Sequence, residues 1–77
     1  DADLEIDALG LLCPLPVLRL RKRLADQPSG AVVRLLADDP AAAIDVPHFC
    51  NEAGHAYLGA EPLTGDGAGQ AYLLRVK

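Results

Sequence analysis

Near its middle the chain reads Ala31-Val32-Val33-Arg34-Leu35-Leu36-Ala37, a nearly continuous apolar run interrupted by one arginine. Such a run favours a central strand that helices cover on one face. The breakers Pro28-Ser29-Gly30 precede it, and Asp38-Asp39-Pro40 follows it. Either aspartate can cap a short helical turn that this proline begins. The run therefore predicts a sheet built around residues 31–37.

The sequence before this strand predicts one further strand and one helix. Residues 4–8 alternate apolar and acidic side chains, as a half-buried strand does, and a glycine soon interrupts the pattern. Residues 14–26 are rich in leucine and arginine and contain no breaker after their first turn. Val17, Leu20 and Leu24 recur at helical spacing, so they predict a buried stripe along this helix.

The sequence after the central strand predicts a second helix and a hairpin. Because Pro47 would break a long helix, we expect a turn near residues 40–44 and a helix that begins at Asp45, its N-cap. Gly54 is expected at the C-terminal end of this helix. Two strand-like segments then follow, with a glycine-rich hairpin loop between them. The strands cover residues 57–63 and 71–76, and the loop covers residues 64–70.

The predicted element order is β-α-β-α-β-β. This order predicts an α+β fold, a two-layer α/β sandwich with a four-stranded mixed sheet and two helices on one face. A chain of 77 residues allows a single domain, so residues 1–77 are expected to form one unit.

Composition excludes several classes of function. Eleven acidic and seven basic residues give a net charge of −4, which disfavours nucleic-acid binding. No apolar run approaches the roughly 20 residues that a membrane-spanning helix needs. Two cysteines, Cys13 and Cys50, are too few for a disulfide scaffold and indicate free thiols in a reducing compartment. The first residues are acidic and do not resemble a secretory signal, so we expect a cytoplasmic protein.

Cys13 is the candidate catalytic residue. It lies where the loop after the first strand meets the first helix, and the positive end of a helix stabilises an anion. The expected consequence is a lowered thiol pKa and raised reactivity. Pro14 holds Cys13 outside the helix, and together with Pro16 it stiffens the loop. Because Pro16 occupies the place of a second cysteine in a C-x-x-C pair, no local disulfide can form, and a lone thiol suits covalent carriage of a group.

The first helix is strongly basic. Arg19, Arg21, Lys22 and Arg23 are its charged residues before Asp26, although the chain as a whole is acidic. Arg19 and Arg23 lie four positions apart and Lys22 flanks them, so the three share a face. We expect this face to dock an acidic partner surface, although such a face is most often simply solvated.

The segment Asp7-Ala8-Leu9-Gly10-Leu11-Leu12-Cys13-Pro14-Leu15-Pro16 resembles the signature of the TusA/SirA family of small sulfur-carrier proteins. The resemblance covers essentially the whole chain. Its further parts are Val17, Arg21-Lys22, Ala37-Asp38-Asp39-Pro40-Ala41, Asp45-Val46-Pro47-His48-Phe49-Cys50, Gly54-His55 and Tyr72-Leu73-Leu74-Arg75. The family fold has the β-α-β-α-β-β order predicted above.

The resemblance implies that Cys13 carries sulfane sulfur as a persulfide. The implied donor is a cysteine desulfurase or a rhodanese-type protein, and a downstream protein accepts the sulfur. The family's outlets are tRNA thiolation, molybdenum-cofactor maturation and sulfur oxidation. No metal or organic cofactor is implied, and the protein would be a sulfurtransferase-type carrier rather than a stand-alone enzyme. Leu12 and Leu15 occupy positions that are charged in well-known tRNA-thiolation members, which implies a more apolar docking surface.

Other interpretations remain open at this point. The chain could be a non-catalytic interaction module that docks through the Cys-Pro turn and the basic helix. Cys50 is expected to pack inside its helix, and a resolving role for it is the minority interpretation. A metal site is disfavoured because His48 and Cys50, two positions apart, lie on different faces of a helix, and His55 is expected near the surface. RNA binding on the sheet is also disfavoured, because the chain has only three aromatic residues.

Overall fold

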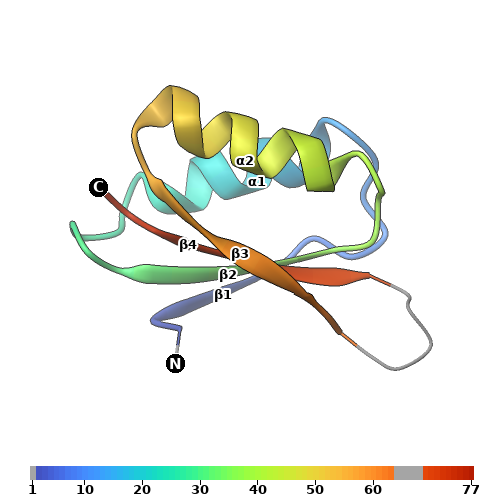
Figure 1. Ribbon diagram of the computed structural model, residues 1–77, viewed down its shortest axis with the longest axis horizontal. Coiled ribbons are helices and arrows are strands. Elements are labelled where there is room, and N and C mark those ends of the chain that lie inside the picture. The colour runs from blue at the N-terminus through green and yellow to red at the C-terminus, as the bar shows by residue number, and fades with distance from the viewer. Residues whose placement is uncertain (1, 64–68) are drawn as a thin grey trace.

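The structure is a computed structural model that describes residues 2–63 and 69–77, so most of the predicted hairpin loop 64–70 lies outside the described residues. The elements follow the predicted order (Figure 1). They are β1 (Leu4–Asp7), α1 (Leu15–Leu24), β2 (Val32–Ala37), α2 (Ala42–Ala53), β3 (Ala56–Pro62) and β4 (Gln70–Arg75). The predicted α+β class and two-layer arrangement are confirmed.

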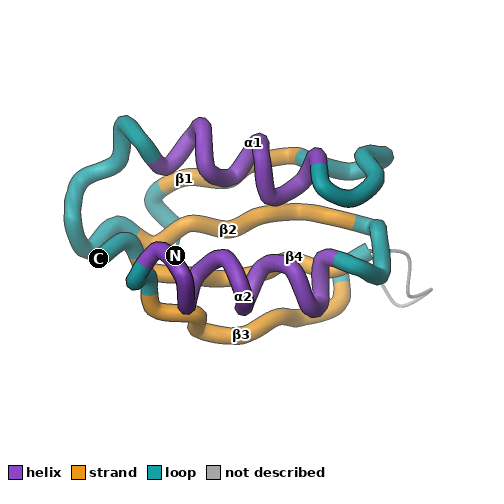
Figure 2. Tube along the Cα trace, turned by 90° about the horizontal axis from the view of Figure 1, so that it is seen from above, coloured by secondary structure: helices purple, strands orange, loops and turns teal. Residues whose placement is uncertain are grey.

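The four strands form one mixed sheet in the order β1-β2-β4-β3. β1 pairs in parallel with β2, because α1 returns the chain across the sheet between them. β4 pairs antiparallel with both β2 and β3. Both helices lie side by side over the same face of the sheet, and each begins at the end of the sheet where β1 and β2 finish (Figures 1 and 2). Loops that lie far apart in the sequence therefore meet at this end.

The core lies between the sheet and the two helices. β2 is central, as predicted, and alternates buried side chains with half-buried ones along its length. Leu20 and Leu24 of α1 are buried and Val17 is half-buried beside them, so the predicted stripe faces the sheet. The largest fully buried side chains come from all elements except β3: Ile6, Leu20, Val33, Leu35, Val46, Cys50 and Leu74.

The predicted start of the second helix is wrong. α2 begins at Ala42, and Asp45 lies in its first turn instead of capping it. Asp39 does cap the turn at Pro40, because its Oδ1 accepts the Ala41 N–H at 3.0 Å, but this turn runs directly into α2. The first helical N–H groups bond three residues back, and that of Ala43 reaches the Pro40 oxygen at 3.2 Å.

Burial explains why α2 tolerates an internal proline. Pro47 cannot donate to the Ala43 carbonyl, and a proline inside a helix costs about 3 kcal/mol. Val46 and Phe49 are buried on the face that α2 turns to the sheet. Each such side chain contributes about 1.5–3 kcal/mol when fully buried. The free energy gained by burying these two side chains offsets the cost of Pro47, so the helix continues past the proline.

Candidate functional site

Cys13 is exposed and lies two residues before the start of α1. It lies one residue before Pro14, the N-cap of α1, so the predicted junction of loop and helix is confirmed. The Leu15 N–H donates to the Leu12 oxygen at 2.8 Å and closes a turn around Cys13 and Pro14. Pro16, by contrast, is buried. One proline thus stays at the surface beside the sulfur, and the other anchors the turn in the core.

Two aspartates after β2 hold the loop that carries Cys13. Both carboxylate oxygens of Asp38 accept the Gly10 N–H at 3.1 Å. Oδ2 of Asp39 accepts the Cys13 N–H at 2.5 Å. The N–H groups of Ala41 and Cys13 lower the pKa of Asp39, because they stabilise its charged form. The loop that presents the sulfur is therefore fixed by a segment about 26 residues away in sequence.

A third aspartate contacts the sulfur itself. Sγ of Cys13 donates to Oδ2 of Asp45 at 2.9 Å, from the first turn of α2. This contact links the loop before α1 to α2 at the sulfur of Cys13. Sequence reasoning treated Asp38, Asp39 and Asp45 only as helix caps and missed their roles around Cys13. The sequence did contain a signal for these roles, because all three aspartates lie in segments that resemble the family, Ala37–Ala41 and Asp45–Cys50.

The predicted lowering of the Cys13 pKa is wrong. The pKa is raised, chiefly by the hydrogen bond to Asp45 and also by desolvation and the negative charges of Asp45 and Asp39. A helix N-terminus is equivalent to about half a positive charge. Asp45 places a whole negative charge at hydrogen-bond distance from Sγ, so the carboxylate outweighs the helix.

Cys13 opens into a groove between the two helices. The groove has a volume of about 400 Å³, and its lining includes Val17 and Arg21 from α1 and Phe49 from α2. The Arg21 guanidinium lies 5.7 Å from the centre of the Phe49 ring, a cation–π distance. Among the basic residues of α1, Arg21 is therefore the one beside the thiol. It was left out of the predicted docking set, although its position four residues after Val17 places it on the same helix face.

The three predicted docking residues line a different hollow. This hollow has a volume of about 490 Å³ and is lined by Arg19, Lys22 and Arg23. Its apolar lining comes from Leu11, Leu15 and Leu18. The prediction that these three cations share a face is thus confirmed. The Arg19 guanidinium donates to the Asp7 oxygen at 2.8 Å, so it also braces the end of β1.

Exposed leucines surround the Cys-Pro turn. Leu12 is 71% exposed, and Leu9, Leu15 and Leu18 are between 42% and 48% exposed. Single exposed leucines are ordinary, but several around one turn mark a surface suited to contact with another protein. The predicted apolar character of this surface at Leu12 and Leu15 is therefore present in the structure.

The second cysteine lies in the core. Cys50 is 1% exposed within α2, so the prediction that it packs inside its helix is confirmed, and burial raises the pKa of its thiol. Its neighbour His48 is exposed and pairs with Glu52 at 3.0 Å. His55 is partly buried, with its ring centre 5.7 Å from that of Phe49. Within residues 2–63 and 69–77, no group of three or more His, Cys, Asp or Glu side chains is placed to hold a metal ion.

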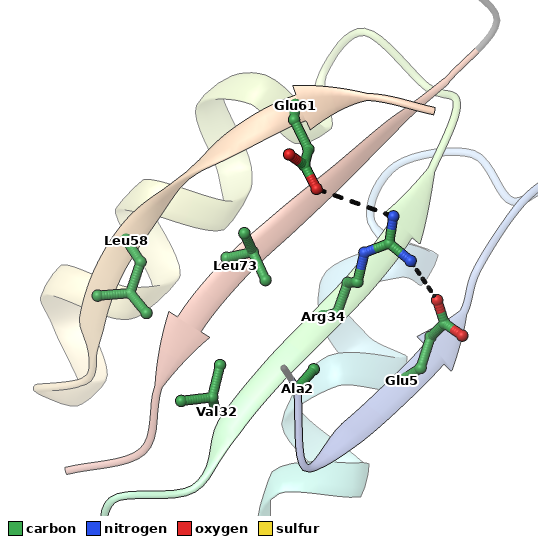
Figure 3. A pocket seen from close by; sticks show the side chains of 7 residues that line it. All are labelled: Ala2, Glu5, Val32, Arg34, Leu58, Glu61 and Leu73. Carbon is green, nitrogen blue, oxygen red and sulfur yellow. Dashed lines mark hydrogen bonds and ion pairs between the residues drawn. The ribbon is translucent and has the colours of Figure 1, made fainter. Parts of the chain in front are cut away.

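A larger hollow lies on the opposite face of the sheet, away from the helices (Figure 3). Arg34 stands at its centre, 2.6 Å from Glu5 and 3.9 Å from Glu61. Both carboxylates pair with this cation, and the residues that line the hollow include no thiol or hydroxyl group. The chemistry of the described residues therefore points to Cys13 and not to this hollow. None of the described helices has the length and apolar character needed to cross a bilayer.

Comparison with known proteins shows the family of this chain. A family model described as sulfurtransferase TusA matches residues 4–76. The chain belongs to the TusA family. The sulfur carrier protein TusA of Pseudomonas syringae pv. syringae (strain B728a) is 43% identical over 53 residues, which are 69% of this chain and 63% of that protein. The chain thus aligns with less than two thirds of that TusA protein.

The family fold is also seen in a solved structure. The crystal structure of a SirA-like protein from Desulfitobacterium hafniense matches with a TM-score of 0.69 and 28% sequence identity. The match covers 96% of this chain and 99% of that chain. The predicted resemblance to the TusA/SirA family of sulfur carriers is therefore confirmed.

Proposed function

We propose that this protein carries sulfane sulfur as a persulfide on Cys13 and relays it between two other proteins. The observation behind the proposal is the contrast between the two thiols of a TusA-family chain. Cys13 is exposed on a loop that two aspartates fix, whereas Cys50 is buried. A group carried between proteins must be reachable by both, so Cys13 is the residue suited to this role.

The transfer exchanges one sulfur–sulfur bond for another. The Cys13 thiolate attacks the terminal sulfur of the donor's persulfide, a bond forms at Cys13 Sγ, and the donor leaves as a thiolate. In the second step the acceptor's thiolate attacks the terminal sulfur on Cys13, and Cys13 leaves as a thiolate. Neither step needs an external oxidant or reductant, and neither needs a metal or organic cofactor.

The proposed donor is a cysteine desulfurase or a rhodanese-type protein, and the proposed acceptor is a sulfur-accepting protein. We place this relay in the cytoplasm, where thiols stay reduced. The family's outlets are tRNA thiolation, molybdenum-cofactor maturation and sulfur oxidation. Leu12 and Leu15 stand where known tRNA-thiolation members carry charge, which favours a partner with an apolar contact surface.

We propose that partners dock on the surface formed by Arg19, Lys22 and Arg23 with Leu15 and Leu18. This surface combines cations with exposed apolar side chains, and it extends from the Cys-Pro turn along α1. A partner with acidic residues around an apolar centre would match it in both respects.

Intact-mass measurement tests the carrier function. Incubation with a cysteine desulfurase and cysteine should add one or more sulfur atoms, and a reductant should remove them. Cys13→Ser should abolish loading, whereas Cys50→Ala should still load. If no sulfur is added, a rhodanese-type donor is the next test. Loading of Cys13→Ser would mean that another residue carries the sulfur. Complementation by Cys13→Ser of a strain that lacks the gene would instead favour a docking module.

A further inference from the structure

The Cys13 sulfur and the Asp45 carboxylate form a direct contact between the loop before α1 and the first turn of α2. We propose that Asp45 is a positioning residue that holds the Cys13 thiol protonated and directed toward α2 in the empty, unbound carrier. The contact joins residues 32 positions apart, so it depends on the packing of α2 beside α1.

The proton of this contact belongs on the sulfur. An ordinary aspartic acid has a pKa of about 3.9 and an ordinary cysteine about 8.5, so at neutral pH the carboxylate accepts and the thiol donates. Asp45 lies in the first turn of α2, with its Oδ2 2.9 Å from Sγ. At this distance a carboxylate opposes a second negative charge on the sulfur.

The other charged groups around Cys13 do not move the proton from the sulfur. The backbone N–H of Cys13 donates to Asp39, a second carboxylate. Arg21 lines the same groove, but its guanidinium lies over the Phe49 ring. The remaining charged or titratable side chains of the groove, both from α2, are His48 and Glu52, which pair with each other. The groups that contact Cys13 directly are therefore both acidic.

The contact also distinguishes the empty carrier from the loaded one, a consequence that rests on the proposed function. A persulfide has sulfur where the thiol has its proton, so Sγ can no longer donate to Asp45. Loading would therefore release the hydrogen bond between the loop and α2. An empty carrier kept as a thiol would also react slowly with small electrophiles while it waits for a donor.

Alkylation of the free protein by iodoacetamide tests the inference without any sulfur donor. The rate is followed by intact mass from pH 6 to pH 10, and Cys13→Ser gives the background from Cys50. Asp45→Asn keeps the side-chain size and an acceptor oxygen but removes the charge. We expect its pH profile to shift to lower pH, with a rate at pH 7 about threefold or more above the wild type. Glu52→Gln, in the same groove but without a contact to Sγ, should match the wild type.

A second measurement uses Cys50→Ala, so that the thiol followed is that of Cys13. In native Cys50→Ala, Cys13 should alkylate with a midpoint at higher pH than in the same variant unfolded in urea. A native midpoint at or below the unfolded one would overturn the inference, and so would an unchanged profile for Asp45→Asn with native circular dichroism. Sulfur loading by a desulfurase is scored separately, so failure to load would count against the proposed function and not against the role of Asp45.

Discussion

The backbone N–H of Cys13 donates to Oδ2 of Asp39 at 2.5 Å, while Oδ1 of the same carboxylate accepts the Ala41 N–H at 3.0 Å. One side chain thus fixes both the loop that presents the sulfur and the turn that leads into α2. The two oxygens have different partners, so a residue with a single acceptor oxygen cannot replace this carboxylate fully.

Asp39→Asn should therefore loosen the Cys13 loop. An amide retains one acceptor oxygen, so either Cys13 or Ala41 loses its hydrogen bond. We expect a Tm lower by a few degrees and faster amide hydrogen exchange at whichever residue is released. Asp26→Asn, an exposed acid at the end of the first helix, is the matched control and should leave both measurements unchanged. Equal effects of the two substitutions would assign the loss to net charge instead of the hydrogen bonds.

Substitution of a buried leucine and of an exposed leucine on α1 should affect stability and docking differently. Leu20 is fully buried, whereas Leu18 is 47% exposed beside the basic residues. Leu20→Ala should lower the free energy of unfolding by about 3 kcal/mol, because it leaves a cavity in the core. Leu18→Ala should change it by less than about 0.5 kcal/mol.

Urea denaturation of both leucine variants measures this difference. Sulfur transfer from a cysteine desulfurase then tests the docking surface, and Leu18→Ala should slow it although the fold is intact. Similar unfolding free energies for the two variants would mean that α1 does not pack as described. Normal transfer by Leu18→Ala would remove this leucine from the docking surface.

The sequence was sufficient for the parts of the fold that follow from local patterns. Alternation in residues 4–8 and the apolar run 31–37 indicated strands, and helical spacing of Leu20 and Leu24 indicated the buried face of α1. The start of α2 was missed because the local effect of Pro47 was weighed without the burial of its neighbours. The burial of these neighbours depends on the packing of α2 against the sheet, and a local sequence pattern carries no information about that packing.

The position of Cys13 before the first helix could be predicted from the sequence, but the charges around its sulfur could not. The place of Cys13 before a helix could be inferred from the residues next to it, and so could a lowered pKa. Asp39 and Asp45 reverse that shift, and they lie 26 and 32 residues away, brought to the sulfur by the parallel pairing of β1 and β2. Arg21 was a different omission, because its spacing from Val17 was visible in the sequence.

His55 should make the free energy of unfolding depend on pH. Nδ1 of His55 accepts the Lys77 N–H at 3.2 Å, and desolvation, with the positive charge of Lys77, lowers its pKa. The neutral ring is therefore favoured in the folded protein. Its contribution should be complete above the unfolded pKa of about 6.5 and lost as the pH falls through the lower folded value.

Thermal unfolding between pH 8 and pH 5 measures the effect of His55. We expect Tm to fall with pH in this range, and His55→Gln should reduce the slope because glutamine does not titrate. His48→Gln is the control, since His48 is exposed and its ring contacts Glu52 at the surface. A slope that persists in His55→Gln and disappears in His48→Gln would reverse the assignment.

Charge reversal on α1 should slow partner docking. Lys22→Glu with Arg23→Glu turns a cationic surface into an anionic one, whereas Arg19 is left intact because it braces Asp7. At low salt we expect about tenfold slower sulfur transfer from a cysteine desulfurase, since opposite charges accelerate association. The difference should shrink near 1 M salt, where the Debye length falls to about 3 Å. The single variant Lys22→Glu is compared with Arg75→Glu, on β4, which changes the net charge by the same amount. Equal slowing by these two variants would place docking outside this surface.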